Sequence, residues 1–140
     1  MAIQSDPSIQ DVIAVAEFRS ALRHFLRRSE KIARHSGLTP QRYTLLMMIK
    51  GAADGSEQST VTELSDRMQL AQSTVTELVR RAESAGLIER EQSQRDARVA
   101  HLRLSAEGER RLMLSFTELD AERAQLREAF ANLDGGATGH

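Results

Sequence analysis

The chain has 140 residues, which fits a single domain, because domains commonly contain about 100–150 residues. Its 19 Lys and Arg and 20 Asp and Glu leave a net charge of -1, which excludes a uniformly basic nucleic-acid binder and an acidic disordered polymer. The absence of cysteine excludes disulfides, thiol catalysis and Cys-ligated metals. The sequence shows no bilayer-spanning apolar run and no signal peptide, so we expect a cytoplasmic protein without a membrane partner.

Helical periodicity dominates the first part of the chain. Gly37 is expected to end the first helix, and Thr60 with Glu63 forms the pattern of a capping box. Gly86 is well placed to end the fourth helix in a left-handed conformation. In chain order, we predict a long helix over 8–35, a helix that Pro40 begins, a polar loop over 54–59, a short helix from Thr60 to about Met68, a tight turn at 69–71 and a helix over about 72–85.

The pattern then changes from a helical period to alternation, which is typical of strands. Two short strands are predicted at 87–91 and 98–104, with the polar residues 92–97 as a hairpin loop between them. A last helix follows over 106–133 without a break, and we expect no separate final helix after it. Residues 134–140 are expected to form a flexible tail.

The order helix, tight turn, helix and hairpin is that of a winged helix-turn-helix, whose second helix fits the major groove of DNA. Small polar side chains at the start of this helix suit base edges, and arginines suit phosphates and guanine. The residues that provide this chemistry are Gln72, Ser73, Thr74, Thr76, Glu77, Arg80 and Arg81 on the helix, and Arg95 and Arg98 on the hairpin.

The segment from Thr60 to Arg90, TVTELSDRMQLAQSTVTELVRRAESAGLIER, resembles the helix-turn-helix of MarR-type transcription regulators. The most specific elements are Ala85-Gly86-Leu87-Ile88-x-Arg90 and the downstream Asp96-x-Arg98, and the resemblance extends over about residues 8–131. It implies one domain over 1–140 that is mainly α with a small β-hairpin wing. In that domain a winged helix-turn-helix lobe over 38–104 lies between dimerisation helices at 8–36 and 106–133.

The resemblance also implies a homodimer that binds a palindromic operator in double-stranded DNA, usually as a repressor. Gln72, Ser73, Thr74, Thr76, Glu77 and Arg80 would then lie in or along the major groove. Arg95 would sit at the wing tip near the minor groove, and Arg98, held by Asp96, would brace the wing or contact phosphate. Thr60 and Arg67 would approach the DNA backbone.

Members of this family often bind small aromatic acids or phenols between the dimer helices and the DNA-binding lobe. The corresponding candidates are His24, Arg28, Tyr43, Met47 and Phe116, although each also fits an ordinary core or surface position. The sequence contains no Gly-rich phosphate loop, no activated nucleophile and no histidines at metal-ligand spacing. We therefore expect neither an enzyme nor a cofactor or metal site.

Several residues depart from the usual pattern. Ala71 stands where a capping side chain is common, and Ser65 and Gln69 stand where the motif generically prefers Ala and Gly. Glu77 has two interpretations, because it could accept a hydrogen bond from cytosine N4 or pair with Arg80 or Arg81.

Charge bears on both the dimer and the lobe. Residues 17–35 carry a charge of +4 and residues 105–134 a charge of -3, which favours pairing of the two terminal helices, although both could simply face solvent. The lobe from Thr60 to Leu104 has seven bases and seven acids, so DNA binding would require the acids to face away from the groove. The alternative function is a winged-helix protein-interaction module without DNA binding.

Overall fold

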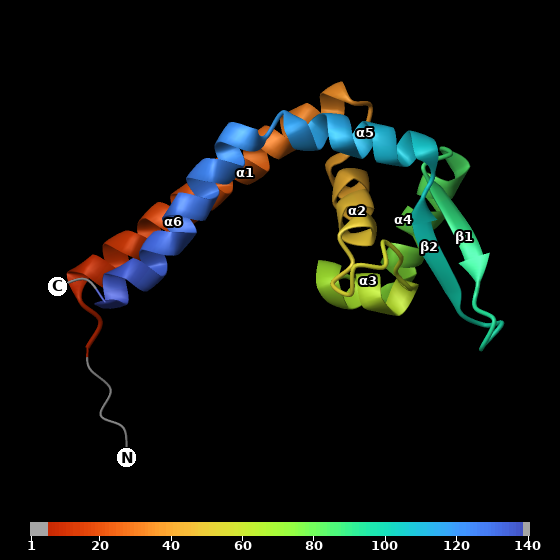
Figure 1. Ribbon diagram of the computed structural model, residues 1–140, viewed down its shortest axis with the longest axis horizontal. Helices are drawn as coiled ribbons and strands as arrows, with labels where there is room; N and C mark the ends of the chain where they lie inside the picture. Colours follow the sequence, from red (N-terminus) through yellow and green to blue (C-terminus); the bar gives the residue numbers. More distant parts are fainter. Residues whose placement is uncertain (1–5, 139–140) are drawn as a thin grey trace, which may run out of the picture. The chain divides into compact units, whose positions relative to one another are not determined.

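The computed structural model describes residues 6–138, which form a mainly helical protein with one two-stranded antiparallel hairpin, as predicted (Figure 1). No helix among these residues is long and apolar enough to cross a membrane. The elements are α1 (Ile9–His35), α2 (Pro40–Lys50), α3 (Val61–Met68), α4 (Gln72–Ser84), β1 (Ile88–Gln92), β2 (Ala100–Leu104), α5 (Ala106–Thr117) and α6 (Asp120–Thr138).

The described backbone divides into two compact units. One unit contains α1 up to Ile32 together with the chain from Thr117 onward, and the other contains Ala33–Phe116. The helix-turn-helix and the hairpin therefore share a unit with α5, whereas α6 belongs with α1. We expected all of 106–133 to accompany the first helix, and the structure assigns only its second part to that unit.

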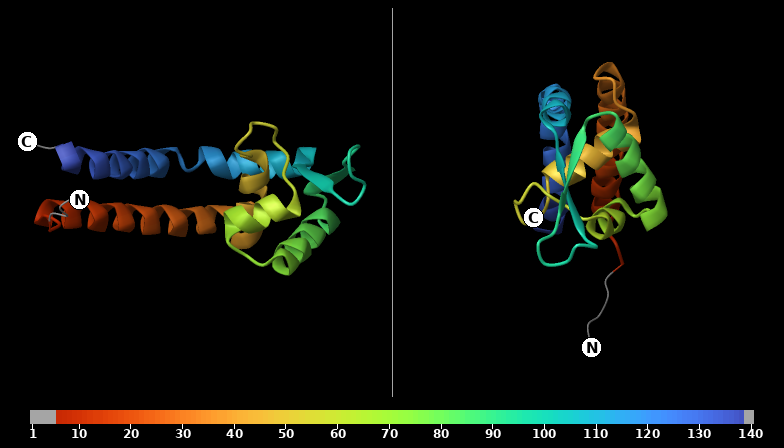
Figure 2. Two further views of the ribbon diagram at one scale, coloured as in Figure 1. Left: turned by 90° about the horizontal axis from the view of Figure 1, so that it is seen from below. Right: turned by 90° about the vertical axis from the view of Figure 1, so that its right-hand side faces the viewer.

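In the first unit, α1 and α6 run antiparallel and side by side (Figure 2, left). Ser8 begins α1 with a reciprocal cap, in which its Oγ accepts from the Asp11 amide and its own amide donates to the Asp11 carboxylate. Phe18 of α1 meets Phe130 of α6 edge to face at a centroid distance of 6.0 Å. The opposite charges of the two helices meet in an ion pair between Arg28 Nε and Glu122 Oε1, at 3.5 Å.

The prediction of a single unbroken helix over 106–133 is wrong. The structure ends α5 at Thr117 and begins a separate α6 at Asp120, which continues to Thr138 and so extends into the expected tail. The sequence has no Gly or Pro between residues 109 and 134, so periodicity alone gave no reason for a break. The break places Leu119 in the core and gives α6 an acidic first turn, which suits the positive end of the helix dipole. Residues 139–140 of the expected tail lie outside the described residues.

The second unit is built around α2. Its Leu45, Leu46 and Ile49 are fully buried, which confirms the prediction of a central helix with two apolar faces. Helices α3 and α4 and strand β2 pack against it. The buried side chains that these elements contribute are Leu64, Val75, Val79, Ala82 and Leu102.

The hairpin pairs β1 with β2 in antiparallel register, with Ile88 opposite Leu104 and Gln92 opposite Ala100. Strand β1 begins one residue later than predicted, and β2 begins at Ala100, so residues 93–99 form the loop. Ser59, expected in a polar loop, exchanges backbone hydrogen bonds of 2.8 and 3.0 Å with Leu102. This short bridge fixes the chain entering α3 to the hairpin.

The start of α5 is held tightly against the start of the hairpin. The Ser105 amide donates to the Leu87 carbonyl at 2.9 Å, and the Ser105 Oγ donates to the Gly86 carbonyl at 2.6 Å. The Gly108 amide in turn donates to the Ser105 Oγ at 3.0 Å. A Cβ at Gly108 would lie 2.1 Å from the Leu87 carbonyl oxygen, so only glycine fits this position.

We predict that Gly108→Ala destabilises the protein. In a helix interior, alanine is normally more favourable than glycine by about 1 kcal/mol. Here the clash with Leu87 should reverse the sign of this effect and lower the free energy of unfolding by about 1–3 kcal/mol. Urea unfolding followed by circular dichroism would measure the change. Arg110→Ala, at an exposed position of the same helix, is the control and should change stability by about 0.5 kcal/mol at most. A stabilising effect of Gly108→Ala would contradict the described approach of α5 to Leu87.

Candidate nucleic-acid interface

The tight turn between α3 and α4 is stabilised by the two residues that depart from the generic motif. Gln69 adopts the left-handed conformation with φ 55°, and its Nε2 donates to the Asp66 carbonyl at 2.6 Å. The Ser65 Oγ donates to the Leu70 carbonyl at 2.5 Å. These bonds satisfy one carbonyl at the end of α3 and one in the turn itself, so the turn compensates for the missing Ala and Gly.

Two of the candidate backbone-contacting residues already have partners within the fold. Thr60 forms the predicted capping box, in which its Oγ1 accepts from the Glu63 amide at 3.2 Å and its amide donates to Glu63 at 2.9 Å. The Arg67 Nη1 donates to the Met48 carbonyl at 2.9 Å, which ties α3 to the end of α2. Both residues therefore have structural roles, whether or not they also approach DNA.

The first turns of α4 present a polar outer face. Val75, Val79 and Ala82 are buried on its inner side, whereas the exposed residues of its first half are Gln72, Ser73, Thr74 and Thr76. Ala71 occupies the cap position and makes no side-chain hydrogen bond, as expected. The Gln72 Nε2 lies 3.5 Å from the Thr62 Oγ1, a long contact that leaves its amide largely available.

The pairing interpretation of Glu77 is confirmed. Arg80 donates to both carboxylate oxygens of Glu77, from Nε at 2.9 Å and from Nη2 at 2.5 Å, and the Arg81 Nε donates at 3.0 Å. We call Glu77, Arg80 and Arg81 the α4 ion-pair cluster. Hydrogen bonds from Arg80 and then Arg81 lower the pKa of Glu77 to about 2, so its carboxylate is charged at every physiological pH.

The wing loop holds one arginine and leaves another extended. The Ser93 Oγ accepts from the amides of Arg95 and Asp96, at 3.2 and 3.3 Å. Arg98 donates to Asp96 from its amide at 3.0 Å and from its Nε at 3.1 Å, so Asp96 braces it as expected. The Arg98 guanidinium lowers the pKa of Asp96. Arg95 is exposed and forms no ion pair with any residue that the structure describes.

Acids and bases of the lobe are joined in direct ion pairs, whereas our expectation was that DNA binding would require the acids to face away from the groove. Of its seven arginines, five lie in ion pairs and the Arg67 guanidinium bonds a carbonyl. Arg95 is therefore the one arginine of the lobe whose guanidinium has no partner among the residues that the structure describes. The pairs are Arg80 and Arg81 with Glu77, Arg90 with Glu83 at 2.7 Å, Arg98 with Asp96, and Arg103 with Glu89 at 3.5 Å.

Comparison with known proteins identifies the family. Residues 36–99 match the MarR family model. The chain is 30% identical over 122 residues to YsmB, an uncharacterised HTH-type transcriptional regulator of Bacillus subtilis (strain 168), and the match covers 84% of this chain and 81% of that protein. The chain belongs to the MarR family of winged-helix transcription regulators.

Solved MarR-family structures share the fold. A mutant of MarR from E. coli, complexed with operator DNA, has a TM-score of 0.64 at 20% identity, and the match covers 96% of this chain and 93% of that one. A mutant of MepR from S. aureus, bound to an oligodeoxyribonucleotide, has a TM-score of 0.64 at 18% identity, and the match covers 86% of this chain and 90% of that one. These matches confirm the mainly α fold with a hairpin wing.

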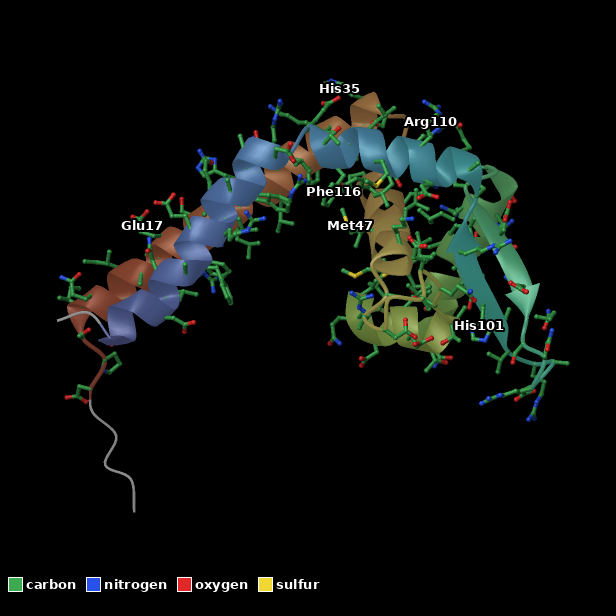
Figure 3. The ribbon with its side chains drawn as sticks, viewed as in Figure 1. Glu17, His35, Met47, His101, Arg110 and Phe116 are labelled. Carbon is green, nitrogen blue, oxygen red and sulfur yellow. The ribbon has the colours of Figure 1, made fainter. Side chains whose placement is uncertain are left out.

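The five effector candidates suggested by the MarR resemblance are divided between the two units. His24 and Arg28 lie on α1 in the first unit, where Arg28 pairs with Glu122. Tyr43, Met47 and Phe116 belong to the second unit, on α2 and at the end of α5. Figure 3 labels Met47 and Phe116. Tyr43 is buried in the core there, so it contributes to packing. In residues 6–138, no group of three or more His, Asp and Glu side chains could hold a metal ion.

Sequence reasoning missed the side chains that shape the loops of this MarR-type lobe. Ser93 was not predicted to have a role, although it stands two residues before Arg95, the spacing at which a hydroxyl accepts a following amide. The Arg90–Glu83 pair joins β1 to α4 across seven residues. No spacing rule for a helix or a strand covers that separation, so only the fold reveals it.

We predict that the α4 ion-pair cluster makes stability depend on acid. The folded pKa of Glu77 lies below its usual value of 4.5, so its pairing stabilises the fold fully above that pH and is lost as pH falls towards about 2. Glu77→Gln should be less stable than wild type at pH 7, and the difference should shrink between pH 4.5 and pH 3. Urea unfolding at pH 7, 4.5 and 3 would measure this. Glu91→Gln is the control, because it removes a lobe acid that forms no ion pair with any described residue. If the stability of both variants relative to wild type changed equally with pH, the role of the α4 ion-pair cluster would be disproved.

Proposed function

We propose that this protein binds a palindromic operator as a homodimer and represses transcription by occluding it. The observation that carries the proposal is the exposed polar row at the start of α4, which consists of Gln72, Ser73, Thr74 and Thr76. This row shares a unit with the wing, whose Arg95 forms no ion pair with any described residue. A helix with such a face fits the major groove, while a cationic wing tip suits the flanking backbone or minor groove. The MarR and MepR structures bound to DNA support this mode of binding.

The residues divide by expected role. Gln72 and Thr74 read base edges in the major groove, and Ser73 and Thr76 lie along its walls. Arg95 contacts the wing-side DNA, and Arg98, held by Asp96, braces the wing that presents it. The proposed DNA interface also includes Glu77, Arg80 and Arg81 on α4, with Thr60 and Arg67 near the phosphates.

The exposed apolar surface of the first unit supports the dimer. Ile9, Val12 and Ile13 of α1 are 69, 54 and 46% exposed, and Phe130 of α6 is 58% exposed. Apolar side chains at this exposure and spacing favour burial against another surface. A second copy covers them in the proposed homodimer, in which two α4 helices enter successive major grooves.

A small aromatic or phenolic effector would act on this dimer by favouring a different spacing of its two DNA-binding lobes. His24, Arg28, Tyr43, Met47 and Phe116 are the candidate contacts. Release of DNA then follows because the spacing of the two α4 helices no longer matches successive grooves.

Binding to the DNA upstream of its own gene, measured by fluorescence anisotropy at two salt concentrations, tests the DNA contacts. Arg95→Ala should weaken binding to all sequences and reduce the salt slope by about 0.9, as expected for one lost phosphate contact. Gln72→Ala or Thr74→Ala should instead change the preferred sequence, at about 1–3 kcal/mol per lost base contact. No binding to any genomic fragment at low salt would favour the protein-interaction module, for which the paired arginines provide a specific argument.

Sedimentation equilibrium tests the homodimer. Val12→Glu places a charge in the exposed apolar row of α1 and should shift the protein from dimer towards monomer. Gln10→Glu, which is exposed in the same turn but outside that row, is the control and should leave the dimer intact. A wild-type monomer, or a dimer that tolerates Val12→Glu, would contradict the proposed interface.

A further inference from the structure

Glu77 occupies the middle of the outer face of α4. It lies two residues after Val75 and two before Val79, so the geometry of the helix turns it away from the buried side. Ser73 precedes it by one turn, and Arg80 and Arg81 follow it by one turn. A carboxylate therefore stands at the centre of the surface proposed to enter the groove.

The α4 ion-pair cluster carries two positive charges and one negative charge, and its arginines point at their own carboxylate. Arg80 uses both Nε and Nη2 on Glu77, which is the forked arrangement that it would use on a phosphate. To bind a phosphate in this way, Arg80 must break both of its bonds to Glu77, and Arg81 must break its single Nε bond. Glu77 and the DNA backbone thus compete for the same donors.

We propose that Glu77 determines specificity by restraining Arg80 and Arg81 on non-operator DNA and releasing them on the operator. It acts through the two arginines, as a positioning residue, and the inference rests on the proposed DNA-binding function. In the operator, the carboxylate accepts a hydrogen bond from the amino group of a cytosine instead, because cytosine N4 is a base-edge donor that pairs with glutamate in the major groove. Arg80 and Arg81 then become available to the phosphates.

Discrimination between operator and non-operator DNA arises because releasing the two arginines is unfavourable on non-operator DNA. Without a base donor in reach, releasing the arginines leaves the carboxylate unpaired beside phosphates, and like charges in contact weaken binding. The cluster therefore stays closed and non-operator DNA gains little from Arg80 and Arg81. Specificity is a difference between two affinities, and Glu77 enlarges it by lowering the weaker one.

The chain contains a matched control on α5. Glu107, Arg110 and Arg111 repeat the Glu-x-x-Arg-Arg spacing, and we call them the α5 ion-pair cluster. Arg110 donates to Glu107 at 2.9 and 2.6 Å and the Arg111 Nε at 2.8 Å, nearly the distances found in α4. The pKa of Glu107 is likewise lowered to about 2 by these arginines. This cluster lies outside the helix-turn-helix and the hairpin, so Glu107→Gln removes the same charge and the same bonds without touching the proposed interface.

The experiment compares Glu77→Gln, Glu107→Gln and wild type on an operator fragment and on a non-operator fragment of equal length, over a series of KCl concentrations. Glu77→Gln should bind non-operator DNA more tightly, with a slope of log K against log salt that steepens by about 0.9 to 1.8 for one or two released guanidinium groups. The operator affinity should change less, so the ratio of the two affinities falls. Glu107→Gln should match wild type in both slope and ratio.

A second background tests whether the effect passes through the arginines. In Arg80→Gln/Arg81→Gln protein, adding Glu77→Gln should leave the non-operator slope unchanged, because no guanidinium remains to be released. A persistent effect in that background would overturn the proposal in favour of direct repulsion between Glu77 and phosphate. If wild type binds no DNA, the proposed function fails. If wild type binds its operator but Glu77→Gln leaves the ratio unchanged, the inference alone fails.

Discussion

The arrangement of the DNA-binding lobe depends on one junction, at which α4 ends, the hairpin begins and α5 starts. Gly86 ends α4 with φ 76°, and its carbonyl and that of Leu87 both accept from Ser105. Gly108 permits this approach because a side chain there would overlap Leu87. The junction fixes the direction in which the wing leaves α4, and two elements that must reach the same DNA require such a fixed relation.

The second constraint is the pairing of charges across the lobe. Over residues 60–104, five of seven arginines are in ion pairs and a sixth is bonded to a carbonyl, so most of the guanidinium groups of the lobe are already engaged within the protein. Long-range attraction of DNA depends on uncompensated charge, whereas base readout depends on contacts at close range. Such a lobe places more of its recognition on the polar row of α4 and less on non-specific attraction than a basic lobe would.

Local signals were enough to predict most of the fold and part of the candidate interface. The capping box at Thr60, the period-two pattern of β2 and the Glu77 spacing each depend on residues within a few positions, so each was visible in the sequence. The break between α5 and α6 was not visible, because no Gly or Pro marks it and the burial of Leu119 is a tertiary effect. The Arg90–Glu83 pair and the Ser59–Leu102 bridge join distant positions, which only the folded chain brings together.

The number of charges in this chain indicates little about its partners. A net charge of -1 is compatible with a cationic surface if acids and bases are separated, and with a neutral one if they are paired. Here the helical spacing Glu-x-x-Arg-Arg on α4 and on α5 brings each carboxylate within reach of two guanidinium groups, so one carboxylate engages two arginines and offsets part of their charge. An arginine paired in this way remains a potential phosphate ligand, but only at the cost of its carboxylate's bonds. DNA binding by such a surface is therefore conditional on what the carboxylate finds in exchange, which is a property of the DNA sequence.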